Sequence, residues 1–441
     1  MCRLQYSLRV SYANFGPREL KRRFWLFLVA FLPRNKLLLV SFDGFRWDYD
    51  QDVETPELDQ LRVAGVTAPY VTPPMLTMTS PSHFTIVTGR WVEDHEVVHN
   101  MMFNQKTNFK LPHKLTLKRS EWWDTGATPL WITAQNQGLK TGSYHFPGGG
   151  VNYSGEAVMR HVFETSGLPD DNVTEWRQKV DTVLDWLSLD DFDLVTLYFG
   201  EPDNVGHAVG PETPQRRAIV RQIDAIIGYL RRGIEQRSLS ERLNVILTSD
   251  HGMTTVKKRP LVEEIVLEHY LPLLKLNSFE ILDYGGFGIL TPRPGKELEV
   301  YEALQKVPNI TAYRKEHLPE SFHLAKSQRL PPIIVQADLG FNLNSRFIVY
   351  VNKGDHGYHS GEMDMKSFFR AFGPDFRRNY VSRPFDSIHL YPLMCRLLQI
   401  QPAPHNGSQE VTADLLLQKG PSSFRPTLVL LTSLLLVFFS S

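Results

Sequence analysis

Several aspartate and histidine side chains stand in glycine-flanked turns or directly after apolar runs, where they could carry out chemistry. They are Asp43, Asp203, His207, Asp250, His251 and His356. Carboxylate oxygens and imidazole nitrogens without cysteine suit a catalytic divalent metal ion, since structural zinc sites usually use thiolates. Two such ions can stabilise the attacking and leaving oxygens of a displacement at phosphorus. Each of these short motifs alone is weak evidence, because an Asp beside Gly often marks a turn. The recurrence of such motifs along one chain favours a functional site.

Buried strands are the elements expected to position these side chains. The runs 37–41, 193–199 and 243–248 are almost entirely apolar, and an acid-bearing turn follows each of them. Such runs are typical of strands covered on both faces of a parallel sheet, where ligands bind beyond the carboxyl ends. Helices are expected between the strands, above all a long one that begins at Thr213 and Pro214. The pattern predicts an α/β fold with a mostly parallel central sheet and helices on both faces.

A hydroxyl group at the start of a further predicted helix is another candidate for the site. Residues 77–89 are predicted to enter a helix, with Pro81 in its first turn and Gly89 at its end. A hydroxyl there faces free backbone N–H groups and the positive end of the helix dipole, which together favour a phosphate group. The alternative is that Thr79 or Ser80 only caps the helix.

Five strings in the sequence resemble the ectonucleotide pyrophosphatase/phosphodiesterase family of the alkaline phosphatase superfamily. They are Ser41-Phe42-Asp43-Gly44-Phe45, Thr77-Met78-Thr79-Ser80-Pro81, Asp203 with His207, Ser249-Asp250-His251-Gly252-Met253 and Asp355-His356-Gly357. They occur in order and cover nearly all of residues 35–405. The resemblance implies an alkaline phosphatase-like fold and two zinc ions. One ion would be held by Asp203, His207 and His356, and the other by Asp43, Asp250 and His251.

The same resemblance implies roles for two further residues. Thr79 would lie between the ions and act as the nucleophile, because a threonine hydroxyl attacks well only when a metal lowers its pKa. Asn100 would donate a hydrogen bond to a phosphate oxygen. Two positions depart from the family pattern: His95-Glu96 stands where His-Gly is usual, and Ser82 replaces a cysteine.

The substrate implied by the resemblance is sphingomyelin. The strings LLLVSFDGFRW, TMTSP, LVTLYFGEPD and TSDHGMTTV are most similar to the sphingomyelin-cleaving branch of the family. A phospholipase C-type reaction would then release ceramide and phosphocholine through a phospho-threonine intermediate. Nucleotide-cleaving members tend to carry an aromatic residue after the nucleophile, where this chain has Ser80.

A choline head group needs an aromatic cage for its quaternary ammonium. The candidates are Tyr144, Phe146 and Tyr198, followed by Trp122 and Trp123, and each could equally be a core residue. Three other functions remain open: a choline-phosphodiester hydrolase that prefers lysophosphatidylcholine or glycerophosphocholine, a nucleotide phosphodiesterase, and an inactive surface binding protein. The complete ligand set with Thr79 favours an enzyme.

The two ends of the sequence indicate a membrane-associated protein of the cell surface. Residues 1–34 are expected to be an atypical signal peptide or signal anchor, since a basic stretch precedes an apolar run. Residues 35–405 are the expected catalytic domain and 406–426 a polar linker. Residues 427–441 form a hydrophobic tail, for which GPI attachment and an intact membrane anchor both remain open.

Modification sites and charge add to this expectation. Glycosylation triplets begin at Asn152, Asn172, Asn309 and Asn406 and predict a glycoprotein facing outward from the plasma membrane. The two cysteines, Cys2 and Cys395, provide no internal disulfide framework. Lys+Arg and Asp+Glu balance at 48 each, so nucleic acid is not expected as a main partner.

Overall fold

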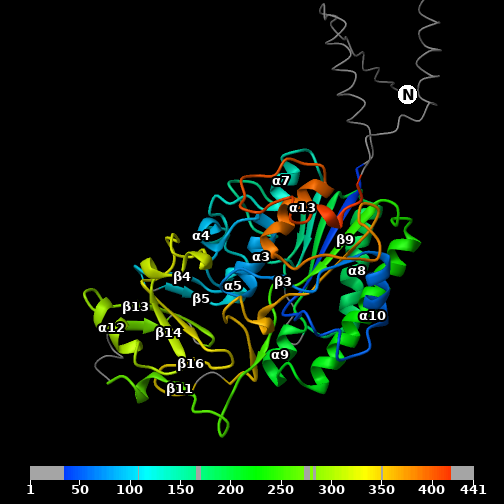
Figure 1. Ribbon diagram of the computed structural model, residues 1–441. Coiled ribbons are helices and arrows are strands. Elements are labelled where there is room, and N and C mark those ends of the chain that lie inside the picture. The colour runs from blue at the N-terminus through cyan, green and yellow to red at the C-terminus, as the bar shows by residue number, and fades with distance from the viewer. Residues whose placement is uncertain are drawn as a thin grey trace, which may run out of the picture. The chain divides into compact units, whose positions relative to one another are not determined.

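The computed structural model describes residues 34–107, 109–164, 170–272, 279–281, 285–348 and 351–418. Within these ranges the largest sheet has eight strands in the order β19-β2-β18-β9-β1-β8-β6-β7 (Figure 1). Strands β7 (Arg160–Val162), β6 (Thr141–Tyr144), β8 (Leu194–Phe199), β1 (Lys36–Phe42) and β9 (Leu243–Thr248) are parallel. Strand β18 (Phe369–Phe372) is antiparallel to β9 and to β2 (Val66–Thr67), which β19 (Tyr380–Val381) joins in parallel. The expected mostly parallel sheet is confirmed.

Helices cover both faces of this sheet, and strand β1 shows why. Its residues alternate between two hydrophobic cores, with Leu37 and Leu39 in one and Leu38 and Val40 in the other. Successive side chains of a strand point to opposite faces, so a continuous apolar run requires cover on both. One core takes in residues of α3 (Thr79–Thr88), α7 (Leu130–Gln135) and α13 (Leu390–Leu397). The other takes in residues of α2 (Pro56–Ala64), α8 (Val173–Ser188) and α10 (Pro214–Gln236).

Helix α10 begins where its capping residues predict. Thr213 caps α10 by accepting a hydrogen bond from the Arg216 amide at 3.3 Å, and Pro214 occupies the first turn. Helix α3 ends at Gly89, whose φ of +64° is the left-handed conformation that glycine adopts readily. Residues 387–397 form the 3-10 turn η5 (Ser387–His389) followed by α13.

A second, antiparallel sheet lies beside the main one (Figure 1). Its order is β12 (Phe279–Ile281), β13 (Phe287–Pro292), β15 (Ile333–Ala337) and β14 (Ile310–Arg314), with α12 (Glu297–Leu304) packed on the same separate core. Four short strand pairs and four helices of the described ranges connect the two sheets or border them. They are β3 (Val71–Thr72) with β20 (Phe385–Asp386), β4 (Met102–Asn104) with β5 (Phe109–Leu111), β10 (Thr254–Thr255) with β17 (Gly354–Asp355), β11 (Ile265–Val266) with β16 (Leu343–Asn344), and the helices α4 (Val92–His95), α5 (His113–Thr116), α6 (Ser120–Trp123) and α9 (Asp203–Val209).

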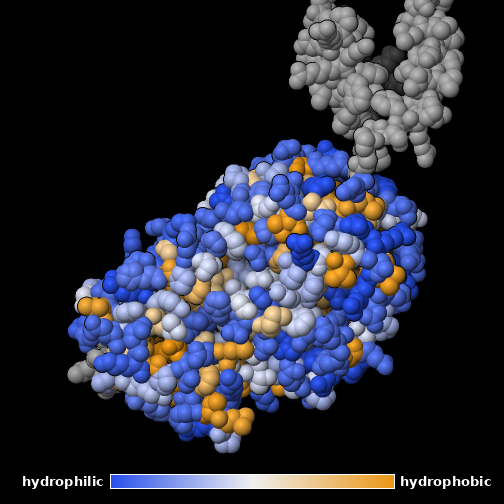
Figure 2. Space-filling view, in the orientation of Figure 1, coloured by the Kyte–Doolittle hydropathy of each residue, from blue (hydrophilic) through white to orange (hydrophobic). Residues whose placement is uncertain are grey.

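The packed chain continues past residue 405, where the sequence predicted the catalytic domain to end. Leu415 is fully buried, and Leu416 forms a β-bridge with Phe376. The predicted leader at 1–34, but for its last residue, and the whole predicted tail at 427–441 lie outside the described residues. Across the described ranges, no helix has both the length and the apolar character that a membrane crossing requires. The face in Figure 2 is mostly hydrophilic, with apolar residues scattered in small groups.

Candidate metal centre and nucleophile

The six predicted ligands lie together, and three of them come from turns behind parallel strands. Asp43 directly follows β1, while Asp250 follows β9 and Asp203 begins α9 behind β8. The six form two groups, Asp203 with His207 and His356, and Asp43 with Asp250 and His251. In each group one candidate ligand atom per residue lies within 4.8 Å of the others. The groups adjoin, because the rings of His251 and His356 stack with centroids 3.7 Å apart.

Each group contains carboxylate oxygens that need a cation. Oδ1 of Asp43, Oδ1 of Asp203 and Oδ2 of Asp250 are buried and have no hydrogen-bond partner among the described residues. A buried carboxylate is costly unless it is paired or binds a metal. Burial, followed by repulsion from Asp250 and Asp203, raises the pKa of Asp43 well above its usual value. A divalent cation in contact with these oxygens would remove that penalty, so the donor set fits a metal centre.

The three histidines are oriented as metal ligands usually are. Nδ1 of His207 lies 2.9 Å from the carbonyl oxygen of Gly354, and Nδ1 of His251 lies 2.9 Å from that of Gly252. Nδ1 of His356 lies 2.7 Å from the carbonyl oxygen of Thr77. A carbonyl oxygen only accepts, so Nδ1 donates its hydrogen and Nε2 is the nitrogen that a metal ion would meet. Nε2 faces the carboxylates: it lies 3.3 Å from Asp203 in His207 and 3.1 Å from Asp250 in His251. Such backbone partners fix the tautomer and direction of ligating imidazoles.

Thr79 lies beside this centre as the first residue of α3. The helix cap is Met78, which has an extended conformation and makes no side-chain capping bond. Thr79 and Ser80 therefore do not cap the helix, and this alternative reading of the sequence is wrong. The Thr79 hydroxyl is buried and lies 3.5 Å from Nε2 of His251. Its oxygen thus stands at a helix N-terminus and next to one candidate ligand group.

Asn100 is held by the residue that follows Thr79. Its Oδ1 accepts a hydrogen bond from the Ser80 backbone N–H at 2.7 Å. The carbonyl end of the side-chain amide is thereby committed to Ser80, and the two Nδ2 hydrogens remain as donors. A donor at this place could reach an oxygen of a phosphoryl group attached to, or approaching, Thr79.

His113 is a further residue at the site, and no sequence motif singled it out. The β4–β5 hairpin carries the chain from Asn100 back to Ser80, where Nε2 of His113 lies 3.4 Å from Oγ. Burial, followed by the charge of His99, lowers the pKa of His113 to about 4, so the ring is neutral near neutral pH. The only sequence signal was a histidine at the start of a short helix, which is too common to be informative.

The aromatic residues proposed for a choline cage do not all lie together, because Tyr144 packs on another core than Phe146 and Tyr198. Tyr198 donates its hydroxyl hydrogen to Oδ2 of Asp43 and is 6% exposed. Phe146 is packed in the core against Trp131, while Tyr144 packs against Trp186 on the opposite face of the sheet. The remaining two candidates, Trp122 and Trp123, are fully buried core residues. Tyr198 thus contributes to the site by orienting a carboxylate.

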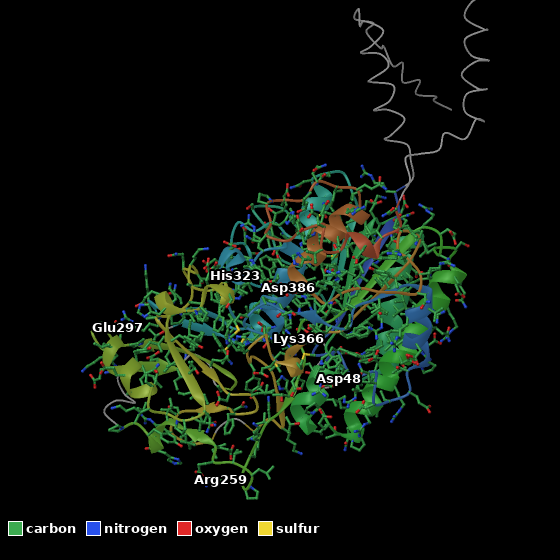
Figure 3. All side chains as sticks on the ribbon, viewed as in Figure 1. Asp48, Arg259, Glu297, His323, Lys366 and Asp386 are labelled. Atoms are coloured by element: carbon green, nitrogen blue, oxygen red, sulfur yellow. The ribbon has the colours of Figure 1, made fainter. Side chains whose placement is uncertain are left out.

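Glu96, one of the two departures from the family pattern, is hydrogen-bonded to a neighbouring loop. It has a positive φ of 58°, a conformation that favours glycine, and so retains the turn expected before Asn100. Its carboxylate accepts hydrogen bonds from the Ser327 hydroxyl at 2.7 Å and the Gln328 amide at 2.8 Å. The same loop region includes His323, labelled in Figure 3, whose ring stacks on Trp91 at 4.2 Å.

The four predicted glycosylation residues lie at the surface. Asn152, Asn172 and Asn406 are exposed, and Asn309 is half-buried. Asn172 also caps α8, since its Oδ1 accepts from the Thr174 amide at 3.0 Å. Their modification stays a prediction.

Known proteins are similar to this chain in sequence and in fold. Residues 37–359 match the type I phosphodiesterase / nucleotide pyrophosphatase family. Human ectonucleotide pyrophosphatase/phosphodiesterase family member 7 is 50% identical over 401 residues, which are 90% of this chain and 87% of that protein. Human family member 5 is 38% identical over 387 residues, which are 87% of this chain and 78% of that protein.

A solved structure has the same architecture. It is murine ectonucleotide pyrophosphatase/phosphodiesterase 5, an inactive threonine-to-alanine variant in complex with AMP. It superposes with a TM-score of 0.81 at 34% identity and covers 87% of this chain and 100% of its own.

Proposed function

Since this chain belongs to the type I phosphodiesterase / nucleotide pyrophosphatase family, we propose that it is a zinc-dependent sphingomyelin phosphodiesterase. Its fold is alkaline phosphatase-like. The reaction is of phospholipase C type and yields ceramide and phosphocholine. The observation that carries the proposal is the pair of adjoining ligand groups next to the Thr79 hydroxyl, with three buried carboxylate oxygens that accept no hydrogen bond among the described residues.

Two zinc ions are the proposed cofactors. Asp203, His207 and His356 would hold one ion, and Asp43, Asp250 and His251 the other. When bound, the ions would lower the pKa of the attacking hydroxyl and offset charge on the phosphate oxygens. Oxygen and imidazole donors without thiolate favour a catalytic site of this kind over a structural one.

The residues of the chain carry the remaining steps. Thr79 Oγ1 attacks phosphorus, the bond from phosphorus to the ceramide oxygen breaks, and the hydroxyl proton of Thr79 ends on ceramide. Water then attacks phosphorus, the bond to Thr79 breaks, and phosphocholine leaves with the threonine hydroxyl restored. Asn100 donates from Nδ2 to a phosphoryl oxygen as charge develops, while Ser80 N–H holds the other end of its amide.

Ser80 supports a substrate with a small head group. The residue after the nucleophile is a serine whose hydroxyl faces His113, so this position offers no aromatic ring on which a nucleotide base could stack. The 50% identity to family member 7, against 38% for member 5, is in line with that choice. Tyr144, Phe146 and Tyr198 stay the predicted head-group contacts, although Tyr144 packs on another core than the other two.

The proposal extends to the setting of the enzyme. We place it at the outer face of the plasma membrane, glycosylated at Asn152, Asn172, Asn309 and Asn406 and anchored through its 427–441 tail. Its catalytic domain would begin at residue 35. A lipid substrate in the same membrane is consistent with such an anchor.

A hydrolysis assay on the protein without residues 1–34 and 421–441 tests the function. Sphingomyelin, glycerophosphocholine and a nucleotide diester are compared, each with and without a zinc chelator, and Thr79→Ala is the matched control. We expect chelator-sensitive release of phosphocholine from sphingomyelin above the other two, and none from Thr79→Ala with zinc still bound. Preference for the nucleotide diester would overturn the substrate. Unchanged turnover by Thr79→Ala would overturn the mechanism.

A further inference from the structure

His83 is a fully buried histidine that belongs to neither ligand group. It lies on α3, one helical turn after Thr79, and none of its side chain is exposed. The rings of Phe146 and Tyr198 contact its ring edge-on, with centroids 5.1 Å and 5.5 Å away. A polar ring enclosed in this way must have its hydrogen bonds satisfied by the protein.

Both ring nitrogens of His83 have such partners, and together they define its tautomer. Nδ1 lies 2.8 Å from the Thr79 carbonyl oxygen, which can only accept, so Nδ1 carries the hydrogen. With the hydrogen on Nδ1, Nε2 is the ring nitrogen that accepts a hydrogen bond. The Ser41 hydroxyl, 2.8 Å away, donates to it. One tautomer of His83 therefore satisfies both contacts.

These two bonds join the nucleophile to the strand that carries a metal ligand. Ser41 is in β1, two residues before Asp43, and Thr79 is the first residue of α3. Nδ1 of His83 also lies 3.4 Å from Oδ2 of Asp250. The Thr79 carbonyl is thus tied, through one rigid ring, to the elements that present Asp43 and Asp250.

We propose that His83 is a positioning residue, which holds the first turn of α3 at a set distance from β1 and so places the Thr79 hydroxyl for attack on phosphorus. This role rests on the proposed phosphodiesterase function. A nucleophile must lie about 3–3.5 Å from the atom it attacks, and a 1 Å misplacement can cost roughly 100-fold in rate. Loss of His83 should therefore lower kcat more than it raises KM.

Two substitutions separate the Thr79 bond from the Ser41 bond. In His83→Asn the side-chain amide can place Nδ2 where Nδ1 was, and so can still donate to the Thr79 carbonyl. In His83→Leu both bonds are lost at similar volume. His95→Asn is the matched control, because His95 is equally buried and also bonds to α3, through the Thr85 hydroxyl at 2.9 Å, but far from the first turn.

The assay measures kcat and KM on the chromogenic diester bis(p-nitrophenyl) phosphate, with zinc per chain and Tm for every variant. We expect His83→Leu to lose roughly 100-fold in kcat with unchanged zinc, and His83→Asn to recover a large part of it. His95→Asn should lower Tm and leave kcat unchanged. If His83→Leu does not fold, Ser41→Ala removes one anchor of the ring and should lower kcat with zinc retained.

Several results would overturn the inference. One is an unchanged kcat in His83→Leu or, where that variant does not fold, in Ser41→Ala. A second is a loss of kcat that only follows loss of zinc. A third is a kcat of His83→Asn no higher than that of His83→Leu. Wild-type turnover of the chromogenic diester without turnover of sphingomyelin would overturn the proposed substrate and leave this test intact. A wild-type protein that cleaves neither would refute both.

Discussion

Asn100 offers the sharpest test of the reaction mechanism, because its two amide ends have different partners. Oδ1 accepts from Ser80 N–H at 2.7 Å, and Nδ2 is the proposed donor to the phosphoryl oxygen. Asn100→Asp keeps an acceptor for Ser80 N–H but replaces the donor with a second oxygen. Asn100→Ala removes both ends. The pair of variants therefore separates anchoring of the loop from stabilisation of developing charge.

The expected magnitudes follow from these contacts. Removing one donor from an oxyanion-type site costs about 100- to 1,000-fold in kcat, or about 2.7–4 kcal/mol. Both variants should show this loss, and Asn100→Asp should lose more, since its charge repels the phosphoryl oxygens. Only Asn100→Ala leaves the Ser80 N–H unpaired, which should lower the free energy of unfolding by about 1 kcal/mol.

Steady-state kinetics on bis(p-nitrophenyl) phosphate and urea unfolding of both variants provide the readouts. A wild-type kcat in Asn100→Asp would refute the donor role of Nδ2. A kcat loss in Asn100→Ala that is absent from Asn100→Asp would show that anchoring of Ser80 is the only contribution.

Three further predictions concern metal affinity, acid stability and packing. Tyr198→Phe removes the hydrogen bond to Asp43, so zinc affinity measured by competition with a chelator should fall by about 10- to 100-fold. Burial lowers the pKa of His95 to about 3. Its unfolded pKa is about 6.5, so its contribution to stability is complete above pH 6.5 and is lost as the pH falls toward 3, by up to about 1.4 kcal/mol per pH unit. His95→Gln should flatten this dependence in urea unfolding measured at several pH values. Ser82→Ala removes a buried hydroxyl that has no partner among the described residues, and should raise the free energy of unfolding by up to about 1 kcal/mol.

Each of these has a clear contrary result. Unchanged zinc affinity in Tyr198→Phe would mean that the tyrosine does not orient the carboxylate. An equally steep acid dependence in His95→Gln would assign the loss of stability to other groups. A destabilised Ser82→Ala would show that the hydroxyl finds a partner in solution.

Much of the framework followed from local patterns. The apolar runs of β1, β8 and β9 predicted buried parallel strands, and the acids after them predicted a site at their carboxyl ends. Both steps are reliable, because the alternation of side chains and the direction of parallel strands are set by the backbone itself. The resemblance to the family, which the comparisons confirm, added the division of the ligands into two groups of three.

The choline cage shows where such reasoning carries little information. Tyr144 and Phe146 are two residues apart, and the chain turns between them, so they pack on opposite faces of the sheet. Aromatic residues are common in cores as well as in binding sites, and composition alone does not tell the two apart. Tyr198 was selected as a cage residue, yet its hydroxyl is bonded to Asp43.

The sequence by itself determined the fold class, the ligand types and the hydroxyl beside them, since these depend on residue type and on spacing along one strand or helix. Only the tertiary structure decided how these groups are aimed. The carbonyl of Thr77 orients His356 although the two are 279 residues apart in the chain. His83 joins Thr79 to Ser41, which lies 42 residues before His83 on another element. Hydrogen bonds of this kind are short-ranged and directional, so they exist only once packing has brought distant segments within about 3 Å.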